Sequence, residues 1–269
     1  MYRKFRKVIV VKFNLFGNIN NPTIIMLSGS FAPGKSMENI YNKMKDEFYI
    51  IVPEYTGHYE GSDVFSTRKQ EAEKIKQFII ENKIVNIKLI YGQSMGTEIG
   101  MELLYQLLSS NIKVEKAFFD GAPFIKLSYL YKKFMYFKFK TMINMFRNKT
   151  IDEVMNWKFL KKFAGDKVQQ LRPMIESVIS CSPYMTNDTI KNEVECCYTF
   201  NFPNMTEEMQ KNICFFYGED EKAYKTCING VTKAYPKSKI IVKKGHGHLT
   251  YACECTDEYI HEIIKFLNE

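Results

Sequence analysis

The chain has 269 residues, 45% of them hydrophobic, which is enough for one large domain or a domain with an inserted subdomain. The formal net charge is +8. The lysines and arginines are spread along the chain, which favours solvated surface charge over a nucleic-acid site. The first seven residues are rich in basic side chains, and the apolar run that follows them, residues 8–11, is too short for a secretion signal. No stretch reaches the length of a membrane span. We therefore expect a cytoplasmic protein that binds no nucleic acid and does not insert stably into a membrane.

Seven cysteines, an odd number, accompany this lack of a secretion signal, so free thiols are expected. Cys196-Cys197 and Cys253-Glu254-Cys255 lack the spacing of zinc ligands. The sequence therefore predicts no metal site and no cofactor, and it does not indicate an oligomeric state.

Apolar runs alternate with segments of helical spacing along most of the chain. The pattern predicts strands at residues 7–14, 23–27, 48–52, 87–90, 114–120, 212–217 and 238–242. It predicts helices at residues 36–47, 66–82, 97–104, 222–235 and 256–267, with Ser36 and Thr256 as caps of the first and last. Such alternation is typical of an α/β fold, in which helices flank a mostly parallel sheet.

The pattern changes between residues 124 and 203, where no strand is indicated. Helical stretches at 127–147, 150–163, 167–180 and 187–197 account for most of this segment. We therefore divide the chain into a sheet domain (1–123 and 204–269) and a helical insertion (124–203). Residues 129–140 are rich in aromatic and basic side chains, which fits a membrane surface, a nucleic-acid site, or a pocket roof whose lysines stay in water. We favour the pocket roof.

A glycine-flanked serine lies where a predicted strand meets a predicted helix. The sequence there is Gly92-Gln93-Ser94-Met95-Gly96. Residues two before and two after a serine on so tight a turn must be small, and glycine supplies both. This G-x-S-x-G sequence and its setting resemble the nucleophile elbow of the α/β-hydrolase superfamily. The resemblance covers nearly the whole chain and implies that Ser94 is a nucleophile and that the helical insertion is a cap.

The resemblance also implies the other catalytic groups. Ser28-Gly29-Ser30-Phe31 stands where the family has its oxyanion loop, so the backbone N–H groups of Ser30 and Met95 would bind an oxyanion. Gly218-Glu219-Asp220-Glu221 follows a strand and holds the expected acid, Glu221 or the adjacent Asp220. The expected base is His248, which fits the family's spacing better than His246. The order nucleophile, acid, base is that of the family.

A rival motif overlaps the expected oxyanion loop. Residues 29–36 match G-x-x-x-x-G-K-[ST], the phosphate-binding loop of nucleotide hydrolases, with Lys35 as its lysine. Asp120 would then be a Mg²⁺ ligand. Pro33 weakens this interpretation because it has no N–H to offer a phosphate. Otherwise Asp120 is a turn residue or a substitute acid, and His58 is a structural histidine that holds its loop.

Together these features predict a serine hydrolase that cleaves a carboxylic ester or thioester through an acyl-enzyme. The expected partner is a small-molecule ester with an apolar acyl or alkyl group. The alternatives are a nucleotide-dependent phosphotransferase that uses the loop at 29–36, and a non-catalytic binding protein on the same fold. The apolar-chain prediction rests on the expectation that these residues line a pocket: Phe124, Leu127, Tyr129, Leu130, Tyr131, Phe134, Met135, Phe137, Phe139, Met142, Met145 and Phe146.

Overall fold

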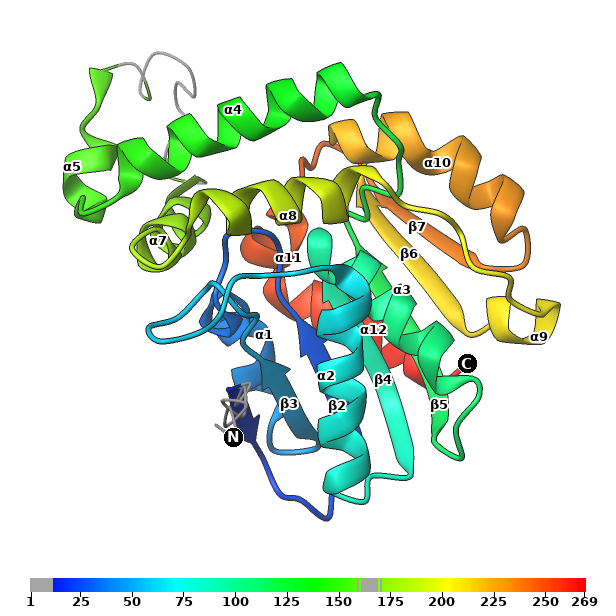
Figure 1. The fold of residues 1–269 in the computed structure, drawn as a ribbon. Coiled ribbons are helices and arrows are strands. Elements are labelled where there is room, and N and C mark those ends of the chain that lie inside the picture. The colour runs from blue at the N-terminus through cyan, green and yellow to red at the C-terminus, as the bar shows by residue number, and fades with distance from the viewer. Residues whose placement is uncertain (1–11, 159, 161–168, 170) are drawn as a thin grey trace, which may run out of the picture.

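A seven-stranded sheet forms the centre of the described structure. The computed structural model of the chain describes residues 12–158, 160, 169 and 171–269 (Figure 1). The strand order is β1-β3-β2-β4-β5-β6-β7, and neighbouring strands are parallel except for β1 and β3. The predicted fold class is confirmed. The strands are β1 (Phe13–Phe16), β2 (Thr23–Leu27), β3 (Tyr49–Pro53), β4 (Asn86–Gln93), β5 (Lys113–Asp120), β6 (Ile213–Gly218) and β7 (Lys239–Lys243).

Helices cover both faces of the sheet because successive strand side chains point to opposite faces. Ile25 and Leu27 of β2 lie in one core, with side chains from α2, α3 and α10. Ile24 and Met26 lie in the other core, with α1, α11 and α12. The helices outside segment 124–203 are α1 (Glu38–Met44), α2 (Arg68–Glu81), α3 (Met95–Leu107), α9 (Glu207–Gln210), α10 (Lys222–Ala234), α11 (Thr250–Glu254) and α12 (Thr256–Leu267).

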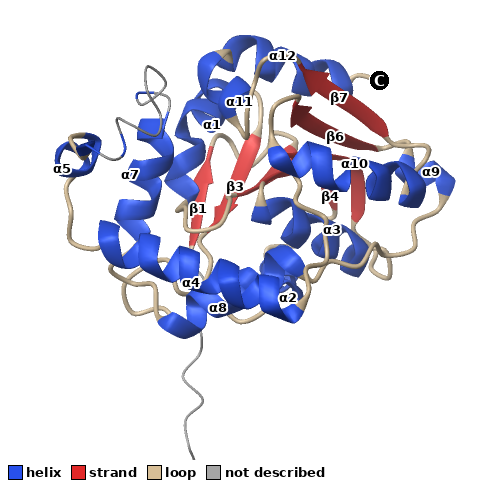
Figure 2. Cartoon of the chain, turned by 90° about the horizontal axis from the view of Figure 1, so that it is seen from above, coloured by secondary structure: helices blue, strands red, loops and turns tan. Residues whose placement is uncertain are grey.

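The described part of segment 124–203 is helical, and its backbone makes one isolated β-bridge, between Lys126 and Thr199. Its helices lie above the carboxyl ends of the strands in Figure 1, and α4 packs against α8 (Figure 2). They share a third core, which Phe31 of the loop after β2 enters. The helices are α4 (Tyr129–Phe146), α5 (Ile151–Met155), α7 (Arg172–Cys181) and α8 (Asn187–Tyr198).

Two predicted helix caps are wrong. Ser36 lies inside a 3-10 turn, Gly34–Met37, that precedes α1, and its buried hydroxyl has no hydrogen-bond partner among the described residues. Thr256 is the first residue of α12, not its cap, because α11 runs directly into α12 and the Thr256 hydroxyl donates to the Ala252 carbonyl of α11. Parts of the predicted elements at 7–14, 150–163 and 167–180 lie outside the described residues.

The prediction that the apolar side chains of residues 124–146 line a pocket is wrong for half of them. Phe124 and Phe146 are buried, and Phe139 packs on Phe31. Six others are large side chains that point to solvent, because α4 buries only the face that packs on α7 and α8. Their exposed fractions are 73% for Tyr129, 75% for Leu130, 66% for Tyr131, 63% for Phe134, 52% for Phe137 and 43% for Met145.

Candidate active site

Ser94 occupies a strained turn between β4 and α3. Its φ of +50° and ψ of −121° lie in a region that non-glycine residues rarely adopt. A Cβ on Gly92 would lie 2.6 Å from the Gly96 carbonyl oxygen, and a Cβ on Gly96 would lie 2.2 Å from that of Leu27. Only glycine therefore fits at these two positions, as the sequence motif implied. The close approach of Gly96 places the first turn of α3 directly against the end of β2.

The loop after β2 runs beside this turn. A Cβ on Gly29 would lie 3.9 Å from Ser94 Oγ. Met95 is the first residue of α3, where an N–H has no partner within the helix. In the loop, the Phe31 N–H donates to Glu193 Oε2 over 3.1 Å, whereas no hydrogen bond between described residues uses the Ser30 N–H. Ser30 and Met95 thus retain backbone donors near the serine.

His248 and Glu221 form a hydrogen-bonded pair from the loops after β7 and β6. The distance from His248 Nδ1 to Glu221 Oε2 is 2.6 Å. Glu221 is buried, and its other oxygen accepts the Gly218 N–H over 3.0 Å. The carboxylate is therefore held in place, while 41% of the His248 side chain is exposed. A neutral imidazole that donates through Nδ1 presents Nε2 as a proton acceptor.

The two rival residues lie elsewhere. His246 Nδ1 is 3.3 Å from Glu254 Oε2 of α11. Asp220 is exposed, and its backbone N–H donates to the His246 carbonyl over 3.0 Å. Neither residue contributes to the pair of His248 and Glu221, although each is within two residues of a member of that pair.

The turn at Asp120-Gly121 links the serine to this pair. The Asp120 carbonyl accepts the Ser94 N–H over 2.8 Å. Gly121 has a φ of +65°, and a Cβ there would lie 2.5 Å from His248 Cε1 and 3.3 Å from Glu221 Oε2. Ser94 and His248 thus flank the same turn. The described residues include no hydrogen bond between them, and catalytic hydrogen bonds are often long before substrate binds.

The Asp120 carboxylate belongs to a buried chain of hydroxyl groups. Its Oδ2 accepts from the Tyr259 hydroxyl over 2.8 Å, and the Tyr259 and Tyr91 hydroxyl oxygens are 2.9 Å apart. Burial, and then the negative charge of Glu221, raise the pKa of Asp120 to about 7, despite donation from Tyr259 and the nearby His248. The tyrosines gave no signal in sequence because they come from a strand and a helix 168 residues apart.

A second histidine–carboxylate pair connects the loops to α8. His58 Nε2 is 2.7 Å from Glu193 Oε1, and both side chains are fully buried. Burial opposes a charge on His58, but the Glu193 carboxylate, with help from the Cys181 thiol, outweighs it and holds the pKa of His58 well above its usual 6.5. His58 was expected to hold its loop, whereas its partner, a lone acid in a helix, was not recognised.

The loop that matches a phosphate-binding motif directs backbone donors at carboxylates. The Gly34 N–H donates to buried Glu54 Oε2 over 2.9 Å, and that of Phe31 donates to Glu193. The Lys35 side chain is 78% exposed, with its nearest carboxylate, Glu38, 4.0 Å away. Carboxylates at these N–H groups would repel a phosphate, so the geometry argues against a nucleotide site.

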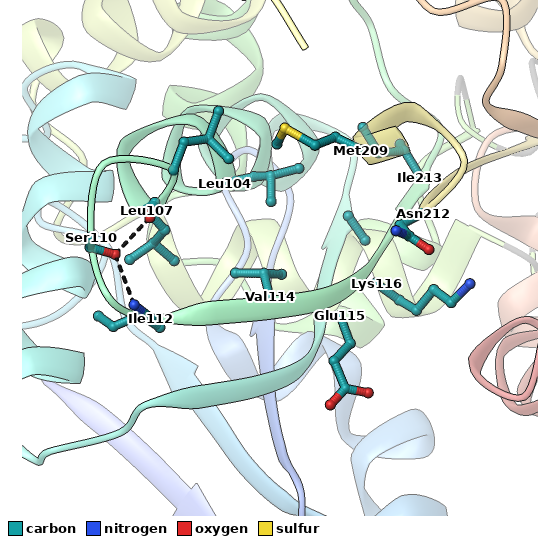
Figure 3. A pocket seen from close by; sticks show the side chains of 12 residues that line it. Leu104, Leu107, Ser110, Ile112, Val114, Glu115, Lys116, Met209, Asn212 and Ile213 are labelled. Carbon is teal, nitrogen blue, oxygen red and sulfur yellow. Dashed lines mark hydrogen bonds between the residues drawn. The ribbon is translucent and has the colours of Figure 1, made fainter. Parts of the chain in front are cut away.

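A cavity of about 220 Å³ lies at the other end of the molecule, between α3, α9 and the start of β5 (Figure 3). Its lining includes Leu104, Val114 and Ile213. Ser110, which also lines it, donates a hydrogen bond from its hydroxyl to the Leu107 carbonyl. None of its lining residues belongs to the candidate active site, because Asp120 ends β5 at the opposite edge of the sheet.

Comparison with known proteins finds similarity in structure only. Neither a family model nor a curated protein matches the sequence. The fold is similar to that of an α/β-hydrolase family protein from Desulfitobacterium hafniense, with a TM-score of 0.72, 15% identity, and coverage of 95% of this chain and 100% of that one. A marine microorganism esterase has a TM-score of 0.71 at 18% identity, covering 95% and 98%. MenH from S. aureus has a TM-score of 0.69 at 17% identity, covering 96% and 97%.

The match spans nearly the full length of each of these structures. The strand order, the elbow between β4 and α3, and these likenesses together define the class: the chain has the α/β-hydrolase fold. At these identities the likeness concerns the fold, so the chemistry must be argued from the chain's own residues.

Proposed function

We propose that the protein is a serine hydrolase that cleaves a carboxylic ester or thioester through an acyl-enzyme. One observation supports this above all. A strained serine lies across the Asp120-Gly121 turn from an exposed histidine whose Nδ1 is bound to a buried carboxylate. That arrangement matches the requirements of a nucleophile, a base and an orienting acid. The presence of esterases among proteins of similar structure agrees with it.

The mechanism follows from these positions. His248 Nε2 accepts the Ser94 proton as Ser94 Oγ attacks the carbonyl carbon, and Glu221 stabilises the imidazolium through Nδ1–H. The oxyanion that forms accepts hydrogen bonds from the N–H groups of Ser30 and Met95. When the C–O or C–S bond breaks, His248 returns the proton to the leaving group. Water, deprotonated by His248, then attacks the acyl-enzyme. The bond between the acyl carbon and Ser94 Oγ breaks, His248 returns the proton to Ser94 Oγ, and the acid leaves.

We further propose that segment 124–203 acts as a cap over a core formed by 1–123 and 204–269. Its helix α8 packs against α3 and buries Ile190, Val194 and Cys197 at helical spacing. The Cys197 thiol is 3.3 Å from the Ser30 hydroxyl, so α8 lies directly over the proposed oxyanion loop, residues 28–31. We propose that an apolar acyl or alkyl group of the substrate lies beneath this helix. Each buried methylene should then raise kcat/KM about fourfold until the pocket is filled, and a flat response from acetyl to octanoyl esters would contradict the apolar substrate.

Covalent labelling tests the nucleophile. A fluorophosphonate should label the parent protein, and Ser94→Ala should abolish labelling and lower turnover by about 10³-fold or more. Ser30→Ala is the matched control. It removes a hydroxyl from the same site but keeps the backbone N–H, so labelling should persist. Equal labelling of Ser94→Ala and the parent would reject the mechanism and favour a non-catalytic binding protein.

A nucleotide titration tests the rival motif. A ligand that binds only the native state raises the melting temperature. ATP or GTP with Mg²⁺ should leave the melting temperature unchanged, because carboxylates hold the loop's N–H groups and Pro33 has none. A rise of several degrees at millimolar nucleotide would favour the phosphotransferase.

A further inference from the structure

The outer face of α4 carries an apolar stripe that nothing in the described structure covers. Leu130, Phe134, Phe137, Thr141 and Met145 recur at spacings of four and three along the helix, so they form one line. The exposed fractions of the four large members run from 75% at Leu130 to 43% at Met145. Amphipathic helices of globular proteins turn such a stripe toward the core, whereas the exposed fractions of these side chains place this stripe in solvent. Helix α4 lies on the outside of the molecule, above α8 (Figure 1).

Positive charge surrounds the stripe. Lys133 and Lys138 are exposed on its two sides, and Tyr129 and Tyr131 extend it at the start of the helix. Lys132 already forms an ion pair, because its Nζ lies 2.6 Å from Glu195 Oε2 of α8. No aspartate or glutamate occurs between residues 121 and 151, whereas this stretch holds seven basic residues: Lys126, Lys132, Lys133, Lys138, Lys140, Arg147 and Lys149.

The combination distinguishes between possible partners. A line of exposed aromatic and aliphatic side chains can insert into an apolar phase such as the interior of a lipid bilayer. Lysines beside that line can bind anions at the surface of that phase. A second copy of this face would bring like charges together, which opposes self-association. A nucleic acid would satisfy the lysines but leave the line of Leu130, Phe134 and Phe137 in water. An anionic lipid surface satisfies both features at once.

We propose that α4 is a docking helix that lies in the surface of a membrane rich in anionic lipid. With 18 residues the helix is about 27 Å long, which suits a helix lying along the interface. In this arrangement the stripe enters the boundary between headgroups and acyl chains, and Lys133 and Lys138 reach lipid phosphates. No helix in the described part of the chain is long and apolar enough to cross a membrane. The docking that we propose is peripheral.

Docking would bring the candidate active site near the lipid. Helix α4 packs on α8, and α8 contacts Ser30 of the oxyanion loop through Cys197. The docking proposal does not depend on the proposed hydrolase activity, because no residue of the stripe belongs to the catalytic machinery. The Ser94→Ala protein should therefore dock as the parent does.

Cosedimentation with vesicles tests the proposal. The full-length chain should bind vesicles of phosphatidylcholine with phosphatidylglycerol much more strongly than vesicles of phosphatidylcholine alone. The double variant Lys133→Gln with Lys138→Gln should lose roughly 25-fold in affinity, about fivefold for each lysine at an anionic surface. Phe134→Ser with Phe137→Ser should lose about tenfold or more on the same vesicles, because two apolar anchors are removed.

Two matched controls lie away from α4. Lys83→Gln with Lys113→Gln removes the same charge from the amino ends of β4 and β5, and Val85→Ser with Tyr105→Ser removes apolar groups that are 68% and 47% exposed. Both controls should bind as the parent. Since each substituted side chain is about half exposed or more, the variants should keep the parent's melting temperature.

Several outcomes would overturn the proposal. One is equal vesicle binding by the parent and the Phe134→Ser, Phe137→Ser protein. Another is an equal loss in the Lys83→Gln, Lys113→Gln control, which would indicate general charge attraction. Absence of vesicle binding by the parent would also overturn it, whether accompanied by a dimer that the phenylalanine variant disrupts or by binding of single-stranded RNA that the lysine variant weakens.

Discussion

Two histidine–glutamate pairs in the described structure, His248–Glu221 and His58–Glu193, have nearly equal geometry and different surroundings. The distance is 2.6 Å between His248 and Glu221 and 2.7 Å between His58 and Glu193. The His248 side chain is 41% exposed, whereas both members of the second pair are fully buried. The first pair joins two loops at the edge of the sheet. The second joins the loop after β3 to α8, and Glu193 also accepts the Phe31 N–H.

The difference shows how exposure assigns a role to the same two side chains. An imidazole that reaches solvent can exchange its proton with a bound substrate, provided that a fixed carboxylate orients it. A fully buried imidazole cannot reach a substrate, so its interaction with Glu193 serves to hold α8 against the oxyanion loop. We therefore expect the first pair to govern turnover and the second to govern stability.

The largest effect is expected from His248→Ala. Loss of the base should lower kcat about 10³- to 10⁴-fold against an ester that the parent hydrolyses. The free energy of unfolding should fall by less than in Glu193→Gln, because the His248 ring is partly exposed and Glu221 still accepts the Gly218 N–H. Steady-state kinetics and urea unfolding measure the two quantities. His246→Ala is the control, and a larger loss of turnover in it than in His248→Ala would reverse the assignment.

The next effect is expected from Glu193→Gln, which leaves His58 buried without its countercharge. The free energy of unfolding should fall by about 3 kcal/mol, since breaking a buried ion pair leaves an uncompensated charge. Glu195→Gln on the same helix is the control. Its pair with Lys132 is partly exposed, so the loss should stay below about 1 kcal/mol. Equal losses in the two variants would show that the buried pair is not the stabilising one.

The pH dependence of the stability difference between the parent and Glu193→Gln gives a second test of the buried pair. The pKa of His58 is raised on folding, so its stabilising contribution is complete below its usual value of 6.5 and is lost as pH rises through the folded pKa. The stability gap between the parent and Glu193→Gln should therefore narrow as the solution becomes alkaline. A gap that widens with pH would contradict a charged His58 in the folded protein.

An effect confined to the pH dependence of stability is expected from Asp120→Asn, which concerns the carboxylate beside the first pair. Its pKa is about 7 in the folded protein against the usual 3.8, so the folded state holds the proton more tightly. Stability conferred on the parent by this proton is complete at low pH and is lost as pH rises from about 4 to 7. Asparagine keeps an acceptor for Tyr259 without the charge. Relative to the parent, the free energy of unfolding of the variant should rise by up to about 4 kcal/mol between pH 4 and pH 8.

The titratable groups around Asp120 bear on this measurement. They are Tyr91 of β4, Cys214 and Tyr217 of β6, Glu221, His248, Cys253 of α11 and Tyr259 of α12. Burial raises the pKa of the Tyr91, Tyr259 and Cys214 groups, so they stay neutral in this range. Parallel pH profiles for the parent and Asp120→Asn would show that Asp120 keeps its ordinary pKa.

Much of the fold could be predicted from the sequence because its signals are local. Buried parallel strands are continuous apolar runs, and the elbow needs glycine at two fixed positions. The placement of Ser94 at the end of β4, and of Glu221 and His248 after β6 and β7, follows from the same alternation of strands and helices. Parallel strands bring their carboxyl ends to one edge, so residues far apart in the chain converge there.

Other features depended on tertiary packing. The choice between Glu221 and Asp220 is a matter of which adjacent carboxylate turns inward, and both occupy the same turn. The link from His58 to Glu193, and that from Tyr91 through Tyr259 to Asp120, join residues more than 130 positions apart. The outer stripe of α4 was assigned to a pocket, because helical spacing marks a face of the helix. Only the position of α7 and α8 decides which face is covered and which one meets solvent.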